Sequence, residues 1–203
     1  MEVVGVATMI KRISLVCVMA ALAAIVAAPS GKAALMCGGS LQPFAQFGDN
    51  NDYFAFSNNG FESGTTGWKV SNAAVGDGNE PWSVNGGGSS SLSIGPGGSA
   101  ASPKVCTALN APGWRMFAHS DNANGPLQAR VVFYGLLGNI TGILNFTSFS
   151  PSGYGSWEPS ASVPSILSLP ILTVSAQLQL TSTATSGTWQ VDDVFVDPCG
   201  MRG

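Results

Sequence analysis

The sequence predicts an all-β protein, an antiparallel β-sandwich of the jelly-roll type. Short runs of β-branched and aromatic residues recur between clusters of Gly, Pro, Asn and Ser, and no segment keeps a helical period for long. Several runs alternate apolar and polar residues, which is typical of antiparallel strands with one face in the core and one in water. About nine short strands in about 150 residues fit a sandwich.

The expected strands follow one another with turn residues between them. The run 171–180 shows the alternation most clearly, because Thr173, Ser175, Gln177 and Gln179 are separated by Leu, Val or Ala. The Gly- and Ser-rich stretch 85–102 is expected to form two loops around one short strand. The full set of expected strands is 53–56, 67–71, 91–94, 103–107, 114–119, 128–134, 140–149, 171–181 and 188–196.

Residues 1–33 have the three parts of a secretory signal peptide. Lys11 and Arg12 precede an apolar run at 13–28, and small residues then lead to a cleavage site near Ala33. The apolar run is shorter than the roughly 20 residues that span a bilayer, which argues against a membrane anchor. We therefore expect a secreted protein whose mature part does not insert into a membrane. It comprises a lead with Cys37 (34–52), a β-sandwich domain (53–198) and a tail (199–203).

The composition excludes several classes of partner. Charged residues make up 9% of the chain, well below the typical value of about 25%, and the formal net charge is −3. No stretch concentrates Lys and Arg, so neither nucleic acid nor an anionic membrane is an expected partner. A hydrophobic fraction of 45% is enough to build a core.

Three cysteines remain after cleavage, Cys37, Cys106 and Cys199. In an oxidising compartment we expect one disulfide and one leftover thiol. The spacing leaves the pairing open. A bond from Cys37 to Cys106 would tie the lead to a mid-chain strand, whereas a bond from Cys37 to Cys199 would join the two ends.

No catalytic residue is predicted. His119, the single histidine, lies in an expected strand, and the chain has no GxSxG turn that would present a nucleophile. We expect this histidine to be hydrogen-bonded or solvated. Glu62, Glu80 and Glu158 are the glutamates available for the carboxyl pair of a glycoside hydrolase. Their pairing in space is not visible in the sequence, so hydrolysis stays a second alternative.

Two segments indicate a buried acidic site. Residues 59–68 read NGFESGTTGW and residues 189–198 read WQVDDVFVDP. Whichever face of the final strand is buried, an aspartate lies among apolar neighbours, and a buried carboxylate is costly unless it is paired, hydrogen-bonded or bound to a metal. A period of two puts Trp189, Val191, Asp193 and Phe195 on one side, and Asp192 with Val194 and Val196 on the other.

These segments resemble the jelly-roll carbohydrate-binding modules of the galactose-binding-like superfamily. In those modules the first and last strands lie side by side, and a Glu and an Asp hold a structural Ca²⁺ together with backbone carbonyls. The resemblance assigns this role to Glu62 and to Asp193 or Asp192, and it implies Ca²⁺ as the cofactor. Oxygen ligands of this kind are those that Ca²⁺ takes.

The mature part as a whole resembles an uncharacterised family of secreted bacterial proteins. The resemblance implies the sandwich fold and favours a Cys37–Cys106 disulfide, with Cys199 as an extra thiol. That family has no established activity, so it implies no function. The shared features are Cys37, Pro43-Phe44, Gly48-Asp49, residues 61–64, 79–81 and 102–106, and residues 189–198.

Trp82, Trp157 and Tyr154 are the expected ligand-binding residues. They lie in loops rich in Gly, Ser and Pro, where carbohydrate-binding modules present aromatic rings to sugars. An aromatic side chain in a loop also serves to plug that loop onto the sandwich, because large aromatic residues mostly bury. Trp68, Trp114 and Trp189 are expected in the core.

The sequence thus predicts a non-catalytic module that binds a polysaccharide or a cell-surface glycan. The first alternative is a structural or interaction protein of the cell envelope that has no sugar ligand.

Overall fold

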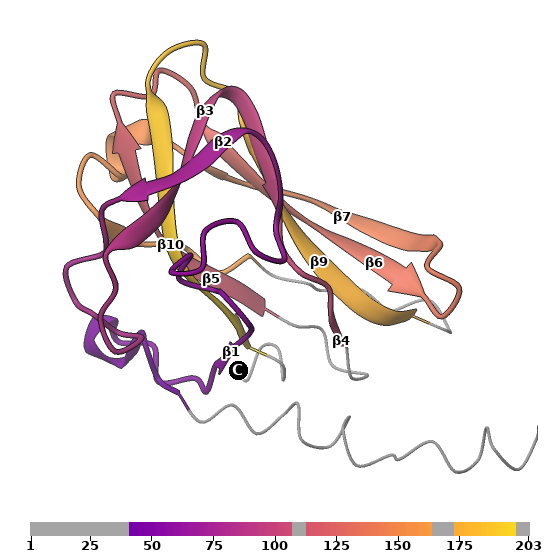
Figure 1. Cartoon of the computed structure of the whole chain (residues 1–203). Coiled ribbons are helices and arrows are strands. Elements are labelled where there is room, and N and C mark those ends of the chain that lie inside the picture. Colours follow the sequence, from indigo (N-terminus) through magenta and orange to yellow (C-terminus); the bar gives the residue numbers. More distant parts are fainter. Residues whose placement is uncertain (1–40, 107–112, 164–172, 198–203) are drawn as a thin grey trace, which may run out of the picture. The chain divides into compact units, whose positions relative to one another are not determined.

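The structure is a computed structural model that describes residues 41–106, 113–163 and 173–197 (Figure 1). The pairings between its named strands are antiparallel, which confirms the predicted all-β fold. The elements are η1 (Ala45–Phe47), β1 (Phe54–Ala55), β2 (Lys69–Asp77), β3 (Ser90–Ala101), β4 (Val105–Cys106), β5 (Gly113–Asp121), β6 (Leu127–Gly135), β7 (Ile140–Phe149), η2 (Pro151–Gly153), β8 (Glu158–Pro159), β9 (Thr173–Ser182) and β10 (Thr188–Asp197).

Several predictions fall outside the described residues. They are the signal peptide, Cys37 and Cys199, so the cleavage site and the disulfide pairing stay predictions. Cys106 is described, and it lies exposed at the end of β4. Within the described ranges, no helix has the length and apolar character needed to cross a bilayer.

In the ranges that the structure describes, ten strands form one curled sheet. Its order is β7-β6-β9-β3-β10-β5-β8, with β1 on β10, β2 on β3 and β4 on β9. Figure 1 shows β6, β7 and β9 running together, as their pairing requires. The first strand lies beside the last, with Phe54 opposite Val196, as the resemblance to carbohydrate-binding modules implies.

Strand β3 corrects the expectation of two loops around a short strand at 91–94. It runs for 12 residues, and its first half pairs with β10 while its second half pairs with β9. The change of partner occurs at Gly95–Gly98. A side chain at Gly98 would place its Cβ 2.4 Å from the backbone oxygen of Asn72, so glycine permits the close approach of β2 at this bend. The glycines that suggested loops therefore allow a bent strand.

The main core lies on one face of these strands. Trp68, Trp114 and Trp189 are buried in it, as the sequence predicts. Met116, two residues after Trp114 on β5, points to the same face and is buried in the same core.

A second aromatic cluster covers the opposite face of β5 and β10. Phe44, Tyr53, Phe117 and Phe195 are its buried members. The rings of Phe44 and Phe117 are stacked with their centroids 5.1 Å apart. Because Phe44 precedes η1, the described part of the N-terminal lead packs onto the sandwich and buries this face.

A bulge in β10 overturns the predicted period of two. Asp193 has a positive φ of 46°, and the pairing with β5 shifts register between Asp192 and Phe195. The extra residue reverses the alternation, so Val194 joins Trp189 in the main core while Phe195 faces the second cluster. The strand is buried on both sides because the main core covers one face and the second cluster covers the other.

Strand β9 follows its predicted alternation only in part. Ala176, Leu178 and Leu180 are buried as expected, but Val174 is 39% exposed. The ladder with β6 shifts register beside Val174, which ends the alternation there. Gln177 is buried although it lies on the predicted wet side, because its amide donates to the Ser102 backbone oxygen at 2.6 Å.

Candidate functional site

Three buried carboxylates gather where the loop after β2 meets the bulge of β10. Glu80, Asp192 and Asp193, which we call the carboxylate cluster, are 1%, 0% and 4% exposed. Asp192 accepts hydrogen bonds from two backbone amides, that of Asp193 at 2.8 Å and that of Glu80 at 3.2 Å. Asp192 therefore ties the loop to the bulge.

Burial changes the acidity of both aspartates. It raises the pKa of Asp192 to about 8, and the negative charge of Asp193 adds to this effect. Burial likewise raises the pKa of Asp193 to about 7, with the charge of Glu80 as the next cause. Near neutral pH, the cluster therefore favours either protonation or a bound cation.

Glu80 is engaged by its own loop. One carboxylate oxygen accepts from the backbone amide of Trp82, and the other accepts from that of Val84 at 2.8 Å. These bonds fix the conformation of the loop that bears Trp82. Since both oxygens are occupied by backbone donors, the geometry suits a structural role rather than proton transfer.

Glu62 lies at the surface beside this cluster. Its Oε1 accepts hydrogen bonds from the backbone amides of Ser89 and Ser90, at 3.0 and 2.9 Å. It shares a small hollow of about 30 Å³ with Asp193. The structure thus places Glu62 and Asp193 at one hollow. Asp192 is not among its lining residues, and its two oxygens accept from the backbone amides of Asp193 and Glu80.

The lining of this hollow suits a hard cation in its donor chemistry. Carboxylates from Glu62 and Asp193 are joined by the side-chain oxygen of Asn79, and oxygen donors of this kind are those of Ca²⁺ sites. Asn85 turns its amide nitrogen toward Asp193. Within the ranges that the structure describes, no group of three or more His, Cys, Asp or Glu side chains forms a metal-binding cluster. Any ion here would therefore depend on amide and backbone oxygens as well.

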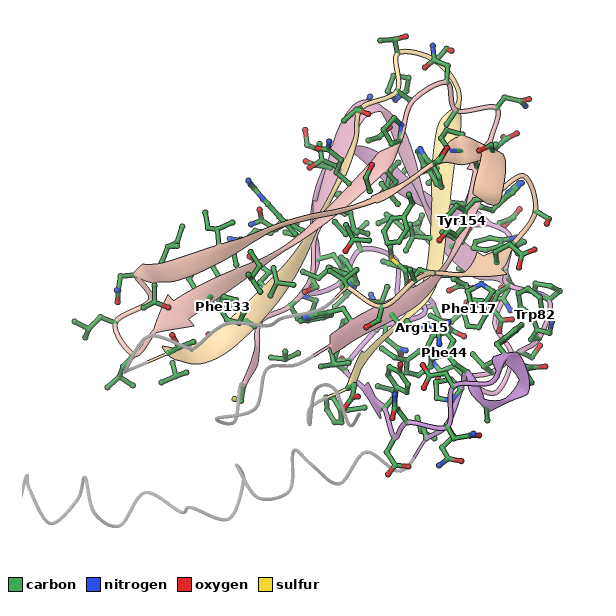
Figure 2. All side chains as sticks on the ribbon, turned by 180° about the vertical axis from the view of Figure 1, so that it is seen from behind. Phe44, Trp82, Arg115, Phe117, Phe133 and Tyr154 are labelled. Atoms are coloured by element: carbon green, nitrogen blue, oxygen red, sulfur yellow. The ribbon has the colours of Figure 1, made fainter. Side chains whose placement is uncertain are left out.

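Trp82 lies on the loop that Glu80 shapes, beside η1 (Figure 2). Its ring contacts Phe47 edge-on at 4.9 Å and Phe117 at 5.3 Å between centroids. It remains half-buried, and with Val84 it borders an open hollow of about 360 Å³. The rest of that lining comes from the lead, from Leu41, Gln42, Pro43, Ala45 and Gln46.

Trp157 and Tyr154 lie elsewhere. Trp157 packs against His119 with ring centroids 5.8 Å apart, at the edge of the second cluster. Tyr154 packs against Trp189 of the main core at 5.7 Å, and burial raises the pKa of its hydroxyl. Neither lines the hollow at Trp82, although Trp157, like Trp82, packs against the second cluster.

His119 agrees with its expected role. Its Nδ1 lies 2.8 Å from Oε1 of Gln190 on the neighbouring strand. Glu158, the third glutamate weighed for hydrolysis, is exposed and accepts a hydrogen bond from the Ser156 hydroxyl at 3.3 Å.

The contribution of the lead to the hollow was not predicted from the sequence. A usable signal was present, because Phe44 and Phe47 are three residues apart and therefore fall on one side of a 3₁₀ turn. Both rings contact Phe117, at 5.1 and 5.8 Å. Reading them as one apolar face would have placed η1 on the sandwich.

Known proteins match this chain in structure but not in sequence. No family model matches it, and neither does any curated protein. TmCBM61 in complex with β-1,4-galactotriose has a TM-score of 0.45 and 15% identity, over 70% of this chain and 95% of that one. The CBM22-1–CBM22-2 tandem domain of Paenibacillus barcinonensis Xyn10C has a TM-score of 0.50 and 14% identity, over 75% of this chain and 47% of that one.

An enzyme-linked structure is also similar. The enzymatically active domain of tailspike protein 4 from bacteriophage CBA120 has a TM-score of 0.53 and 13% identity, over 70% of this chain and 21% of that one. This chain therefore spans less than half the length of the tandem domain and of the tailspike. The matches show that the chain has the jelly-roll β-sandwich fold found in carbohydrate-binding modules.

Proposed function

We propose that this chain is a secreted, non-catalytic module that binds a polysaccharide or a cell-surface glycan. Its fold is that of a structure built from carbohydrate-binding modules, the CBM22 tandem domain. The observation that carries the proposal is the open hollow at Trp82.

The hollow has the features that sugar binding needs. Its size of about 360 Å³ falls within the range of about 300–1,000 Å³ for ligand pockets. Phe47 and Phe117 hold the Trp82 ring in place, so stacking a sugar on it costs little conformational entropy. Gln46 supplies an amide at the same hollow for sugar hydroxyl groups, whereas the amide nitrogen of Gln42 donates to the Asn50 oxygen and to Asp52 within the lead.

Binding to insoluble polysaccharides and to a glycan array tests this proposal. We expect Trp82→Ala to lower retention at least tenfold. Because Trp82 also packs on Phe117, the variant Gln46→Ala tests a polar group of the hollow without changing the ring, and it leaves the Gln42 hydrogen bonds to Asn50 and Asp52 in place. Trp157→Ala is the matched control, since Trp157 lies outside the hollow, and it should bind as the wild type does.

Two results would overturn the assignment. One is glycan binding at the wild-type level by both Trp82→Ala and Gln46→Ala, provided that their melting temperatures show folded protein. The other is failure of the wild-type protein to bind any glycan tested.

Calcium is the proposed structural ion of this module, held by Glu62 and Asp193 with amide and backbone oxygens. It would neutralise the carboxylate of Asp193, whose burial is otherwise unfavourable, and it would join the loop at Gly88 to β10. A chelator should then lower the melting temperature, and Glu62→Gln should remove that sensitivity. Glu158→Gln, a change at an exposed glutamate outside the hollow, should leave it intact.

One observation favours the alternative of an envelope interaction protein. Leu136 and Leu137, in the turn between β6 and β7, are 77% and 93% exposed. Exposed apolar residues of this kind mark contact surfaces when they are contiguous. If that turn is the functional surface, Leu136→Ser with Leu137→Ser should release the protein from the cell envelope, while glycan-array binding is absent.

A further inference from the structure

We infer that a groove across β2, β3, β9 and β6 binds an acidic polysaccharide, a glycan whose sugars carry carboxylate or sulfate groups. The inference rests on the proposed glycan-binding function and names a ligand class for it. The groove lies away from Trp82, since the two hollows share no lining residue.

Strand register builds the groove. Paired residues on these four neighbouring strands form two rows that run across the sheet, with one residue from each strand in each row. The rows are two residues apart along each strand, so their side chains point to the same face. The first row is Lys69, Ala101, Gln179 and Arg130, and the second is Ser71, Ser99, Thr181 and Gln128.

Both rows face away from the core. The residues between them in sequence, Ala100, Leu180 and Ala129, are buried in the main core. Because successive side chains of a strand point to opposite faces, the two rows lie on the outer face. A groove of about 280 Å³ opens there, and its lining includes Lys69, Arg130, Gln179 and Thr181.

The first row has a cationic side chain at each end, Lys69 and Arg130, and the small side chain of Ala101 between them. Neighbouring strands are about 4.8 Å apart, so three strand-to-strand steps separate the backbone positions of Lys69 and Arg130 by about 14 Å across the sheet. The Nε of Arg130 donates to Oε1 of Gln179 at 2.8 Å, which orients the guanidinium group.

These cations are available to a ligand. No acidic residue lines the groove, and neither Lys69 nor Arg130 forms an ion pair within the described part of the chain. The protein as a whole has a formal net charge of −3, so its overall charge does not attract polyanions. An anionic ligand that binds must therefore find this local pair of cations.

The neighbours of the cations favour a sugar over an acidic peptide. Hydroxyl and amide groups of Ser71, Ser99, Thr181 and Gln179 surround them, and such groups match the hydroxyls of a glycan. Guanidinium binds the planar carboxylate of a uronic acid in a bidentate manner, and it binds sulfate oxygens by the same charge-assisted bonds.

Affinity electrophoresis or calorimetry of the full chain with defined polymers tests the inference. The probes are polygalacturonate for carboxylates, dextran sulfate for sulfates, unsubstituted xylan and galactan as neutral glycans, and poly-glutamate as an acidic peptide. We expect binding to polygalacturonate or dextran sulfate that weakens with added salt. Which of the two binds identifies the anionic group.

Charge-removing variants locate the site. Lys69→Gln and Arg130→Gln should each weaken polyanion binding at least fivefold. Lys104→Gln makes the same change in net charge at a lysine that sits 3.4 Å from the Tyr134 ring centroid, outside the groove lining, and should have little effect. Arg130→Lys keeps the charge but loses the planar guanidinium group, so its affinity for the polyanion should lie between those of the wild type and Arg130→Gln.

The outcomes separate this inference from the proposed function. Polyanion binding that survives Trp82→Ala but is lost in Lys69→Gln supports the groove. Three results would each overturn it. Poly-glutamate could bind as tightly as the acidic polysaccharides, Lys104→Gln could weaken polyanion binding as much as Lys69→Gln does, or only neutral glycans could bind. In the last case Trp82-dependent binding would leave the proposed function standing.

Discussion

Asp49 connects the N-terminal lead to strand β5. Its carboxylate accepts hydrogen bonds from the Tyr53 hydroxyl at 2.6 Å, from the Asn51 amide at 3.0 Å and from Arg115. The Arg115 guanidinium carbon also lies 4.5 Å from the Phe44 ring centroid. Burial by itself would raise the pKa of Asp49, but these hydrogen bonds outweigh it and lower the pKa below its usual value.

We predict that Asp49→Asn destabilises the protein by about 1–2 kcal/mol at pH 7. The carboxylate of Asp49 has a folded-state pKa below its unfolded value, so its contribution is complete above about pH 4. That contribution is lost as pH falls through the folded-state pKa. Urea unfolding at pH 7 and at pH 2–3 should therefore show a difference between wild type and variant that shrinks with acid. Asp121→Asn, at an exposed residue, should show no such change.

Residue-scale roles were only partly visible in the sequence. The pairing of Glu62 with Asp193 was predicted from a resemblance, and the structure places both at one hollow. Glu80 was weighed only as a hydrolase acid, because nothing in a sequence shows that two backbone amides will occupy its oxygens. Asp49 and Arg115 are 66 residues apart, so their ion pair depends on the folded chain.

At the scale of elements, the bulge in β10 and the loops beside it form one unit. The backbone amide of Val194 donates to the Asn59 oxygen at 3.0 Å, and the Asn85 side chain donates to Asp193 at 3.2 Å. Gly60 lies between these contacts. A Cβ at Gly60 would fall 2.6 Å from Oδ1 of Asp193, so the bulge requires glycine at this place.

We predict that Gly60→Ala destabilises the fold by about 1–3 kcal/mol, because the buried and hydrogen-bonded Asp193 has little room to move. Gly76→Ala is the matched control. Gly76 lies in β2, and a Cβ added there would have no atom within 4 Å, so its replacement should be neutral or slightly stabilising. Thermal unfolding of both variants measures the contrast, and equal melting temperatures would contradict the tight packing at Gly60.

Element positions followed the sequence closely, and their lengths did not. The nine expected strands are present in the described residues. β8 was not expected, because its two residues are too few to show an alternation of apolar and polar side chains. β2 and β3 are longer than predicted, since they support each other along a shared ladder. Local composition marks where strands occur, but pairing with a neighbour decides where they end.

At the scale of the whole molecule, the sheet has two apolar faces to cover. The main core fills one, and residues of the lead cover the other around Phe44 and Phe117. Figure 2 shows Phe44, Phe117 and Trp82 gathered beside η1, with Arg115 next to Phe44. The lead thereby contributes both to stability and to the wall of the proposed sugar site.

We predict that Phe44→Ala destabilises the protein by about 3–5 kcal/mol, the usual loss for a fully buried phenylalanine. Phe54→Ala, at a residue that is 38% exposed, should cost much less. Denaturant unfolding of the two variants provides the comparison. A small effect of Phe44→Ala would mean that the lead is not part of the cooperative fold.

The sequence alone determined the all-β class, the approximate strand positions and the tryptophans of the main core. These follow from local periodicity and composition, which act between residues close in the chain. The second aromatic cluster, the reversal of alternation at Asp193 and the rows that place Lys69 in line with Arg130 were decided by tertiary structure. Each depends on strand register, which is set by contacts between segments far apart in the chain, and a shift of one residue moves every side chain to the other face.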